Sequence, residues 1–201
     1  MHIVKAMGSS SSFRGLILCA VVAVAVAMAA GQTAWASVLP FSSIEALTEK
    51  AEVVFRGRVQ DVEYRLVDEG RRVVTLLIVS VEDGFKGRDS GDVKVIVPGG
   101  RYGELVQRVA GMPTFYLDEE VVLFLERYPA PRASTAAERF TLVSMGLGAF
   151  LVEGDKALRR ADELRVVRER PGSPEPLGEK DRRMSIAVLE DRIRAAIVMD
   201  E

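Results

Sequence analysis

The sequence has very little of three residue types that carry much of protein chemistry. Its 201 residues include one cysteine, one histidine and one tryptophan, and Cys19, His2 and Trp35 all lie within the first 36 positions. The remaining 165 residues therefore have no thiol and no imidazole. This excludes Ser-His-Asp and Cys-His nucleophiles, the usual zinc sites and disulfides from that part of the chain. Burial of apolar side chains alone must stabilise it.

The first 36 residues are predicted to be a signal peptide. Lys5 and Arg14 supply positive charge, residues 16–30 form an uninterrupted apolar run, and Ala34-Trp35-Ala36 has the small-x-small form that signal peptidase requires. The alternative is an uncleaved membrane anchor, but a run of about 15 residues is short for a bilayer span. We expect export to the periplasm or the medium, cleavage after Ala36, and no membrane attachment afterwards.

The segment after the predicted cleavage site is mildly acidic. It holds all 29 acidic residues and 25 of the 27 basic ones, which gives a formal net charge of −4. Such a surface argues against nucleic acid as the main partner. Its length is sufficient for one domain with a hydrophobic core. Because the usual nucleophilic residue types are missing, we expect no enzyme activity, no cofactor and no resident metal.

Alternation of apolar and polar side chains predicts a long, bent first strand at residues 51–66. The apolar side chains occupy odd positions over residues 53–59 and even positions over residues 62–66. A strand keeps one buried face through such a change only if it carries a β-bulge, which we place near Gln60. Gly57, in mid-strand, also fits a sharp bend. The alternative is an ordinary sandwich strand with an irregular pattern.

The same patterns predict four further strands and a hairpin. The strands are expected at residues 73–81, 93–97, 121–125 and 140–145, and the hairpin at residues 148–152 and 156–160. The strand at residues 73–81 is expected to stop at Glu82-Asp83-Gly84. Residues 101–117 are expected to form a long connection with one helical turn at 104–109, and residues 128–138 to form a loop.

A helix is predicted at each end of this domain. Residues 41–50 follow Pro40, and Ser42 with Glu45 has the form of a capping box. The second helix occupies residues 185–201 and has an apolar stripe of Ile186, Leu189, Ile193, Ala196 and Ile197. We expect this stripe to dock on its own domain, the alternative being a helix that binds a partner. The expected organisation is a barrel domain at residues 37–165, a linker at 166–184 and the C-terminal helix.

Five strands with a bulged first strand, a long connection between the third and the fourth, and helices at both ends indicate a mostly β, OB-like barrel. Three segments resemble the N-terminal domain of tissue inhibitors of metalloproteinases (TIMPs) and related netrin-like modules: AEVVFRGRV at residues 51–59, DGFKG at 83–87 and VKVIV at 93–97. Residues 98–100, 109–115 and 120–125 are similar to a group of exported bacterial proteins of unknown function with the same predicted barrel. The resemblance covers roughly residues 43–152.

The resemblance does not extend to the inhibitory residues. TIMPs place an N-terminal cysteine on the zinc of a protease, and disulfides hold that terminus in position. Here the expected N-terminus is Ser37 and no disulfide holds it, so we expect an unpinned arm that has lost the preorganisation needed for tight binding. We therefore predict an exported, non-enzymatic binding module. The alternatives are a metalloprotease inhibitor and a hydrolase that uses carboxylates alone.

The candidate ligand-facing residues lie between the predicted third and fourth strands. They are Gly99, Gly100, Arg101, Gly111, Pro113 and Phe115. Glycine lets a ligand approach the backbone and Arg101 can pair with an anion, although a plain turn would need no ligand. Asp118-Glu119-Glu120 is interpreted as a solvated turn, with a calcium site as the alternative. The expected partner is an extracytoplasmic protein, either a protease or an envelope component.

Overall fold

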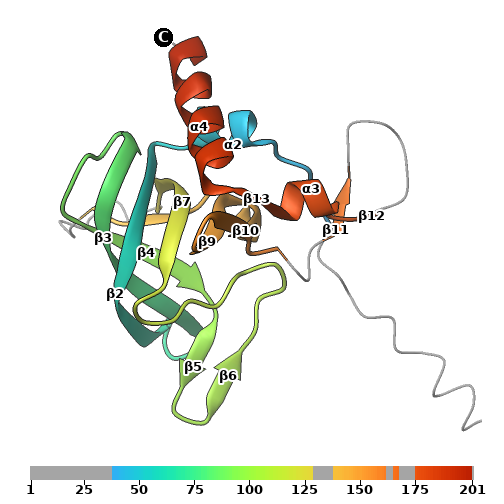
Figure 1. The fold of residues 1–201 in the computed structure, drawn as a ribbon. Helices are drawn as coiled ribbons and strands as arrows, with labels where there is room; N and C mark the ends of the chain where they lie inside the picture. The colour runs from blue at the N-terminus through green and yellow to red at the C-terminus, as the bar shows by residue number, and fades with distance from the viewer. Residues whose placement is uncertain (1–37, 129–137, 162–164, 168–174, 201) are drawn as a thin grey trace, which may run out of the picture. The chain divides into compact units, whose positions relative to one another are not determined.

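The structure is a computed structural model of the chain, and it describes residues 38–128, 138–161, 165–167 and 175–200 (Figure 1). The chain divides into two units, Met1–Trp35 and Ala36–Glu201. The first unit lies outside the described residues, and so do the predicted signal peptide and most of the loop predicted at 128–138. Within the described part, no helix is both long enough and apolar enough to cross a membrane.

Five strands close into a ring at the centre of the second unit. They are β2 (Val53–Val67), β3 (Arg72–Lys86), β4 (Asp92–Pro98), β7 (Glu120–Arg127) and β8 (Phe140–Leu142). The hydrogen-bonded order is β7-β2-β3-β4-β8, and β8 pairs again with β7 in antiparallel fashion. At the parallel β4–β8 seam, Val95 lies opposite Phe140. The protein is therefore mostly β, and the five strands predicted from the sequence are those of the ring.

The predicted bulge in the first strand is confirmed. Val59 lies opposite Val79 and Asp61 lies opposite Ile78, so Gln60 is the extra residue on β2. A second register shift lies between Arg56 and Gly57. A Cβ atom on Gly57 would lie 2.2 Å from the carbonyl oxygen of Ser80, so only glycine permits this close approach of β3.

Two hydrophobic clusters lie on the two faces of the strands. The first fills the ring with alternate side chains of its strands, including Phe55, Leu77 and Leu123, and Phe115 from the long connection joins it. The second lies between the outer face and two helices, α2 (Ile44–Lys50) and α4 (Ile186–Asp200), which lie side by side in Figure 1. Its members include Ile44, Leu47, Phe124, Phe150, Leu189 and Ile193. The C-terminal helix docks on its own domain, as predicted.

The sheet extends beyond the ring from β7. The added strands are β9 (Ala149–Glu153), β10 (Lys156–Arg159) and β13 (Arg183–Ser185), in the order β13-β10-β9-β7. The predicted hairpin at residues 148–160 is therefore confirmed as β9 and β10. The predicted fifth strand ends at Leu142, earlier than expected, because Ser144 and Met145 adopt positive φ angles and begin the 3-10 helix η1 (Met145–Gly148).

Three other local predictions are wrong. The turn at residues 104–109 is not helical, because Leu105–Gln107 forms strand β6, which pairs with β5 (Gly100–Tyr102) in a hairpin that turns at Gly103. Strand β3 does not stop at residues 82–84, because pairing with β2 carries it to Lys86. The cap of α2 is Ser43, whose hydroxyl accepts a hydrogen bond from the Ala46 amide, whereas Ser42 is buried against Ser144.

The expectation of an unpinned N-terminal arm is also wrong for the described residues. Strand β1 (Val38–Pro40) pairs in parallel with β11 (Arg165–Val167), which pairs in turn with β12 (Glu175–Pro176). Backbone pairing therefore holds Val38–Pro40 beside Arg165–Val167. The interval predicted as a linker holds β12, helix α3 (Glu179–Arg182) and β13.

Candidate ligand-binding pocket

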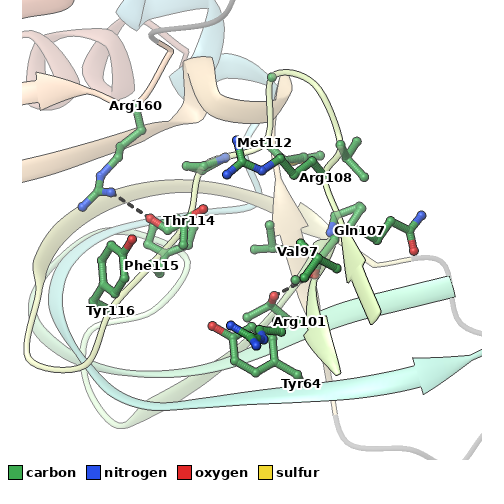
Figure 2. Close-up of a pocket in the computed structure, with 18 of the residues that line it drawn as sticks. Tyr64, Val97, Arg101, Gln107, Arg108, Met112, Thr114, Phe115, Tyr116 and Arg160 are labelled. Atoms are coloured by element: carbon green, nitrogen blue, oxygen red, sulfur yellow. Dashed lines mark hydrogen bonds between the residues drawn. The ribbon is translucent and has the colours of Figure 1, made fainter. Parts of the chain in front are cut away.

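A pocket of about 670 Å³ lies between the β5–β6 hairpin and the loop at residues 108–117 (Figure 2). This volume is within the range of small-molecule sites. All six candidate residues from the sequence line it: Gly99, Gly100, Arg101, Gly111, Pro113 and Phe115. The structure thus brings together two segments that sequence reasoning had linked only through their glycines and proline.

The hairpin side of the pocket depends on Gly100. This residue has a φ angle of +134°, and a Cβ atom on it would lie 2.6 Å from Cδ1 of Tyr64 and 2.7 Å from Oγ1 of Thr75. The Thr75 hydroxyl donates a hydrogen bond of 2.8 Å to the carbonyl oxygen of Gly99. The hairpin therefore lies directly on β2 and β3, at a separation that only glycine permits.

The opposite wall is held by Arg160. Its Nη1 donates to the Thr114 carbonyl oxygen at 2.7 Å (Figure 2), and its Nη2 forms an ion pair with Glu119. Its guanidinium also lies 5.9 Å from the centroid of the Phe115 ring. Phe115 is 2% exposed and belongs to the core of the ring. This wall is therefore fixed by the protein itself before any ligand binds.

The lining has positive charge and no carboxylate. Its three charged side chains are Arg101, Arg108 and Arg160. Arg160 is paired with Glu119, whereas neither Arg101 nor Arg108 forms an ion pair with any residue in the described ranges. Nε of Arg101 donates only to the carbonyl oxygen of Gly103 in its own turn, at 3.3 Å.

All three residues of the acidic run next to the pocket, Asp118-Glu119-Glu120, contact arginines. Glu119 pairs with Arg160, and Glu120 pairs with Arg56 and Arg58. The carbonyl oxygen of Asp118 accepts a hydrogen bond from Arg58. Among the residues that the structure describes, no group of three or more His, Cys, Asp or Glu side chains is arranged to hold a metal ion.

Sequence reasoning missed several residues of this site. Arg108 and Val106 were assigned to a helical turn, and their place in the lining depends on the β5–β6 register. The rim also exposes large apolar side chains, with Val106 56% and Tyr116 60% accessible. Leu105-Val106-Gln107 shows no alternation of apolar and polar residues, and three residues are too few to separate a strand from a turn.

A second pocket of about 380 Å³ lies beside β10 and α3, and its only carboxylate belongs to Glu179. Neither pocket therefore offers the pair of acids that a carboxylate-only hydrolase needs. Arg159 lines the second pocket and is only 4% exposed. Burial lowers its pKa to about 10, its Nη1 donates to the Ser42 carbonyl oxygen at 3.2 Å, and its guanidinium lies 4.9 Å from the Phe150 ring centroid.

No protein-family model matches this chain, and a search of curated proteins returns no match. Functional assignment therefore depends on the geometry and charge of the first pocket.

Proposed function

We propose that this protein is an exported, non-enzymatic binding module and that its ligand occupies the pocket between the β5–β6 hairpin and residues 111–116. The observation that carries the proposal is the contrast within the lining. The walls are fixed by Gly100 on one side and Arg160 on the other, while neither Arg101 nor Arg108 is paired with a carboxylate of the residues that the structure describes. Preorganised walls with unpaired polar groups are typical of binding sites.

We also propose that the ring is an OB-like barrel of the TIMP and netrin-like kind. The support is the bulge at Gln60, the closure of the ring through β8, and a long connection between β4 and β7 that carries a hairpin.

The proposal is tested by filling the pocket. Val109 lines it and is partly buried, so Val109→Trp would occupy part of its volume, whereas Glu104→Trp places the same side chain on the exposed hairpin turn outside the lining. Native mass spectrometry of the purified protein, after incubation with the small-molecule fraction of its own culture, should show a bound mass with the wild type and with Glu104→Trp, and none with Val109→Trp. Turnover of a supplied substrate, or retention of the bound mass by Val109→Trp, would overturn the proposal.

Metalloprotease inhibition is the second candidate, and one observation favours it. Pairing of β1 with β11 fastens the residues that directly follow Ser37, the predicted N-terminus. A fastened arm would present the amine of Ser37 with less loss of entropy than a free one. The test is an inhibition assay against extracytoplasmic metalloproteases, with the amine first free and then acetylated. Absence of inhibition in both forms would end this candidate.

A further inference from the structure

We propose that the ligand of this pocket is an organic anion, in which a carboxylate or phosphate group is attached to an apolar or aromatic body. Arg101 and Arg108 bind the charged group, and the apolar rim of the pocket contacts the body. This inference rests on the proposed function and specifies the chemistry that the same pocket recognises.

Arg101 and Arg108 differ from several arginines elsewhere in the protein. Arg56 is paired with Glu120 and Glu190, Arg58 with Glu82, Arg192 with Glu45, and Arg194 with Asp83. Arg101 and Arg108 have no such partner in the described part of the chain, although the chain carries a net charge of −2. A positive pocket on an acidic protein attracts an anion, and the guanidinium group binds carboxylate or phosphate in a bidentate manner.

The geometry of the hairpin brings the two arginines to one ligand. Arg101 lies opposite Val106 across the β5–β6 pair, and Arg108 is two residues beyond Val106. They are therefore diagonal neighbours, a spacing that long side chains bridge. In Figure 2 both side chains extend from the hairpin toward the pocket. Gly100, which precedes Arg101, also lines the pocket.

The apolar side chains in the rest of the lining favour a ligand larger than a small inorganic ion. Val106 and Tyr116 line the pocket with more than half of their surface exposed, and Met112 and the buried Phe115 also belong to the lining. A hydrated phosphate ion would leave the exposed apolar surface of Val106 and Tyr116 in water, whereas an apolar or aromatic body would cover it. The two kinds of lining together favour a ligand with a charged end and an apolar end.

The same chemistry occurs in free organic acids and in acidic segments of peptides. Calorimetric titration of the purified protein with matched probes separates the two sources. The probes are 4-phenylbutyrate, its neutral amide, phenyl phosphate, inorganic phosphate, and a short blocked peptide of alternating acidic and aromatic residues. Both aromatic anions should bind at least about tenfold more tightly than the neutral amide and inorganic phosphate, which corresponds to the loss of one charged interaction.

Variants assign the binding to the two arginines. Arg101→Gln and Arg108→Gln should each weaken binding of phenyl phosphate about tenfold, because each removes one charge-assisted contact. Lys94→Gln removes one positive charge from an exposed position on β4 outside the lining, so its affinity should change less than about twofold. Arg101→Lys should recover part of the affinity, because it restores the charge without the planar fork. Unchanged thermal midpoints would show that all four variants are folded.

The outcomes separate this inference from the proposed function. If the peptide binds more tightly than 4-phenylbutyrate and requires both arginines, the anion belongs to a protein segment; the reverse order assigns it to a free acid. A different result would overturn only the anion inference. In that case the neutral amide binds as tightly as 4-phenylbutyrate, and Val109→Trp abolishes binding of the amide whereas the glutamine variants do not. The proposal that the pocket binds a ligand would then stand. If the probes bind equally to wild type and Val109→Trp, both are overturned.

Discussion

The face of the protein that the helices cover differs from the end that carries the pocket in two respects: the burial of its apolar side chains and the ion pairing of its arginines. On the covered face Leu189 is fully buried, Arg56 lies between two carboxylates, and Nε of Arg192 donates to Glu45 at 2.8 Å. At the pocket end Val106 is 56% exposed and Arg108 has no carboxylate in the described ranges. In folded proteins most large apolar side chains are buried and most polar groups have a partner. A surface that exposes apolar side chains beside arginines without a carboxylate among the described residues is therefore a candidate ligand-binding site.

The difference also separates stability from function. Apolar burial under α2 and α4 holds the fold together, so substitutions there should mainly lower the free energy of unfolding. The exposed side chains of the pocket rim contribute little to folding, so substitutions there should mainly affect binding. The following predictions test this division, beginning with the largest expected effect.

Truncation of the buried stripe of α4 should be the most costly change. Leu189 is 0% exposed, so Leu189→Ala should lower the free energy of unfolding by about 3 kcal/mol through lost burial and a residual cavity. Val188, the preceding residue, is 49% exposed, so Val188→Ala should change it by less than about 0.5 kcal/mol. Urea denaturation of the two variants measures the difference. Equal losses would contradict the docking of α4 through this stripe.

Adding a side chain at Gly100, on the hairpin side of the pocket, should have the next largest effect. Gly100→Ala combines a φ angle of +134° with a Cβ atom 2.6 Å from Tyr64, and should cost about 2 kcal/mol. Gly70→Ala is the control, because its φ angle is +83° but nothing lies within 4 Å of the added atom, so it should cost about 1 kcal/mol. Thermal unfolding compares them. If Gly70→Ala costs as much as Gly100→Ala, the close contact of the hairpin with β2 and β3 is refuted.

Two adjacent arginines should respond to methionine with opposite signs. Burial disfavours the charge of Arg159 more than the nearby Asp181 and Glu45 favour it, and its Nε has no hydrogen-bond partner among the described residues, so Arg159→Met should be neutral or stabilising by about 1 kcal/mol. Arg160→Met leaves Glu119 and the Thr114 carbonyl oxygen without their donor, and should destabilise by about 2 kcal/mol. Chemical denaturation at neutral pH measures both variants. A larger loss for Arg159→Met would show that its contacts with Ser42 and Phe150 outweigh the cost of burying its charge.

The pH dependence of the Arg159 substitution follows from the direction of its pKa shift. Burial lowers the pKa of Arg159 to about 10, so the folded state binds this proton less tightly than the unfolded state. The proton therefore destabilises the fold at every pH below about 10, and stability recovers only as the pH rises above that value. The difference between wild type and Arg159→Met should be constant from pH 5 to about pH 9. A difference that changes across this window would indicate another titrating group.

The smallest predicted effect is at the Glu45–Arg192 pair that joins α2 to α4. Burial opposes ionisation of Glu45, but hydrogen bonds from its own backbone amide, Arg192 and Ser43 outweigh it and lower the pKa below 4.5. The pair therefore adds stability above pH 4.5, which is lost as the pH falls through the lowered value. Because both side chains are substantially exposed, Glu45→Gln should cost only a few tenths of a kcal/mol at pH 7. Denaturation at pH 7 and at acidic pH should show this cost disappear.

The strands of the ring were predictable because their signals are local. Alternation of apolar and polar residues predicts β2. The apolar residues then move from odd to even positions, which predicts the bulge at Gln60, because without it they would point to the opposite face of the sheet. The six pocket residues were also found, because glycine and proline mark places where the backbone must bend. The β5–β6 hairpin was missed because its strands have three residues each.

Other features depend on contacts between distant parts of the sequence. The ion pair of Arg160 with Glu119 joins β10 to the pocket wall, and the pairing of β1 with β11 joins Val38 to Arg165. No local pattern indicates such partners, because charged residues occur throughout the chain. For the same reason the sequence did not reveal that Arg108 forms no ion pair within the described ranges, since this depends on which segments line the pocket.

Backbone amide NMR spectra of the isotopically labelled protein, recorded during a titration with phenyl phosphate, test the central claim most directly. The amide signals of residues 99–101, 111–112 and 114–116 should shift and saturate together, while those of Leu189 and Ile193 under the covered face should remain in place. Saturable shifts confined to the covered face, or no saturable shift at the pocket with any of the anionic probes, would contradict the assignment of this end of the protein as its binding site.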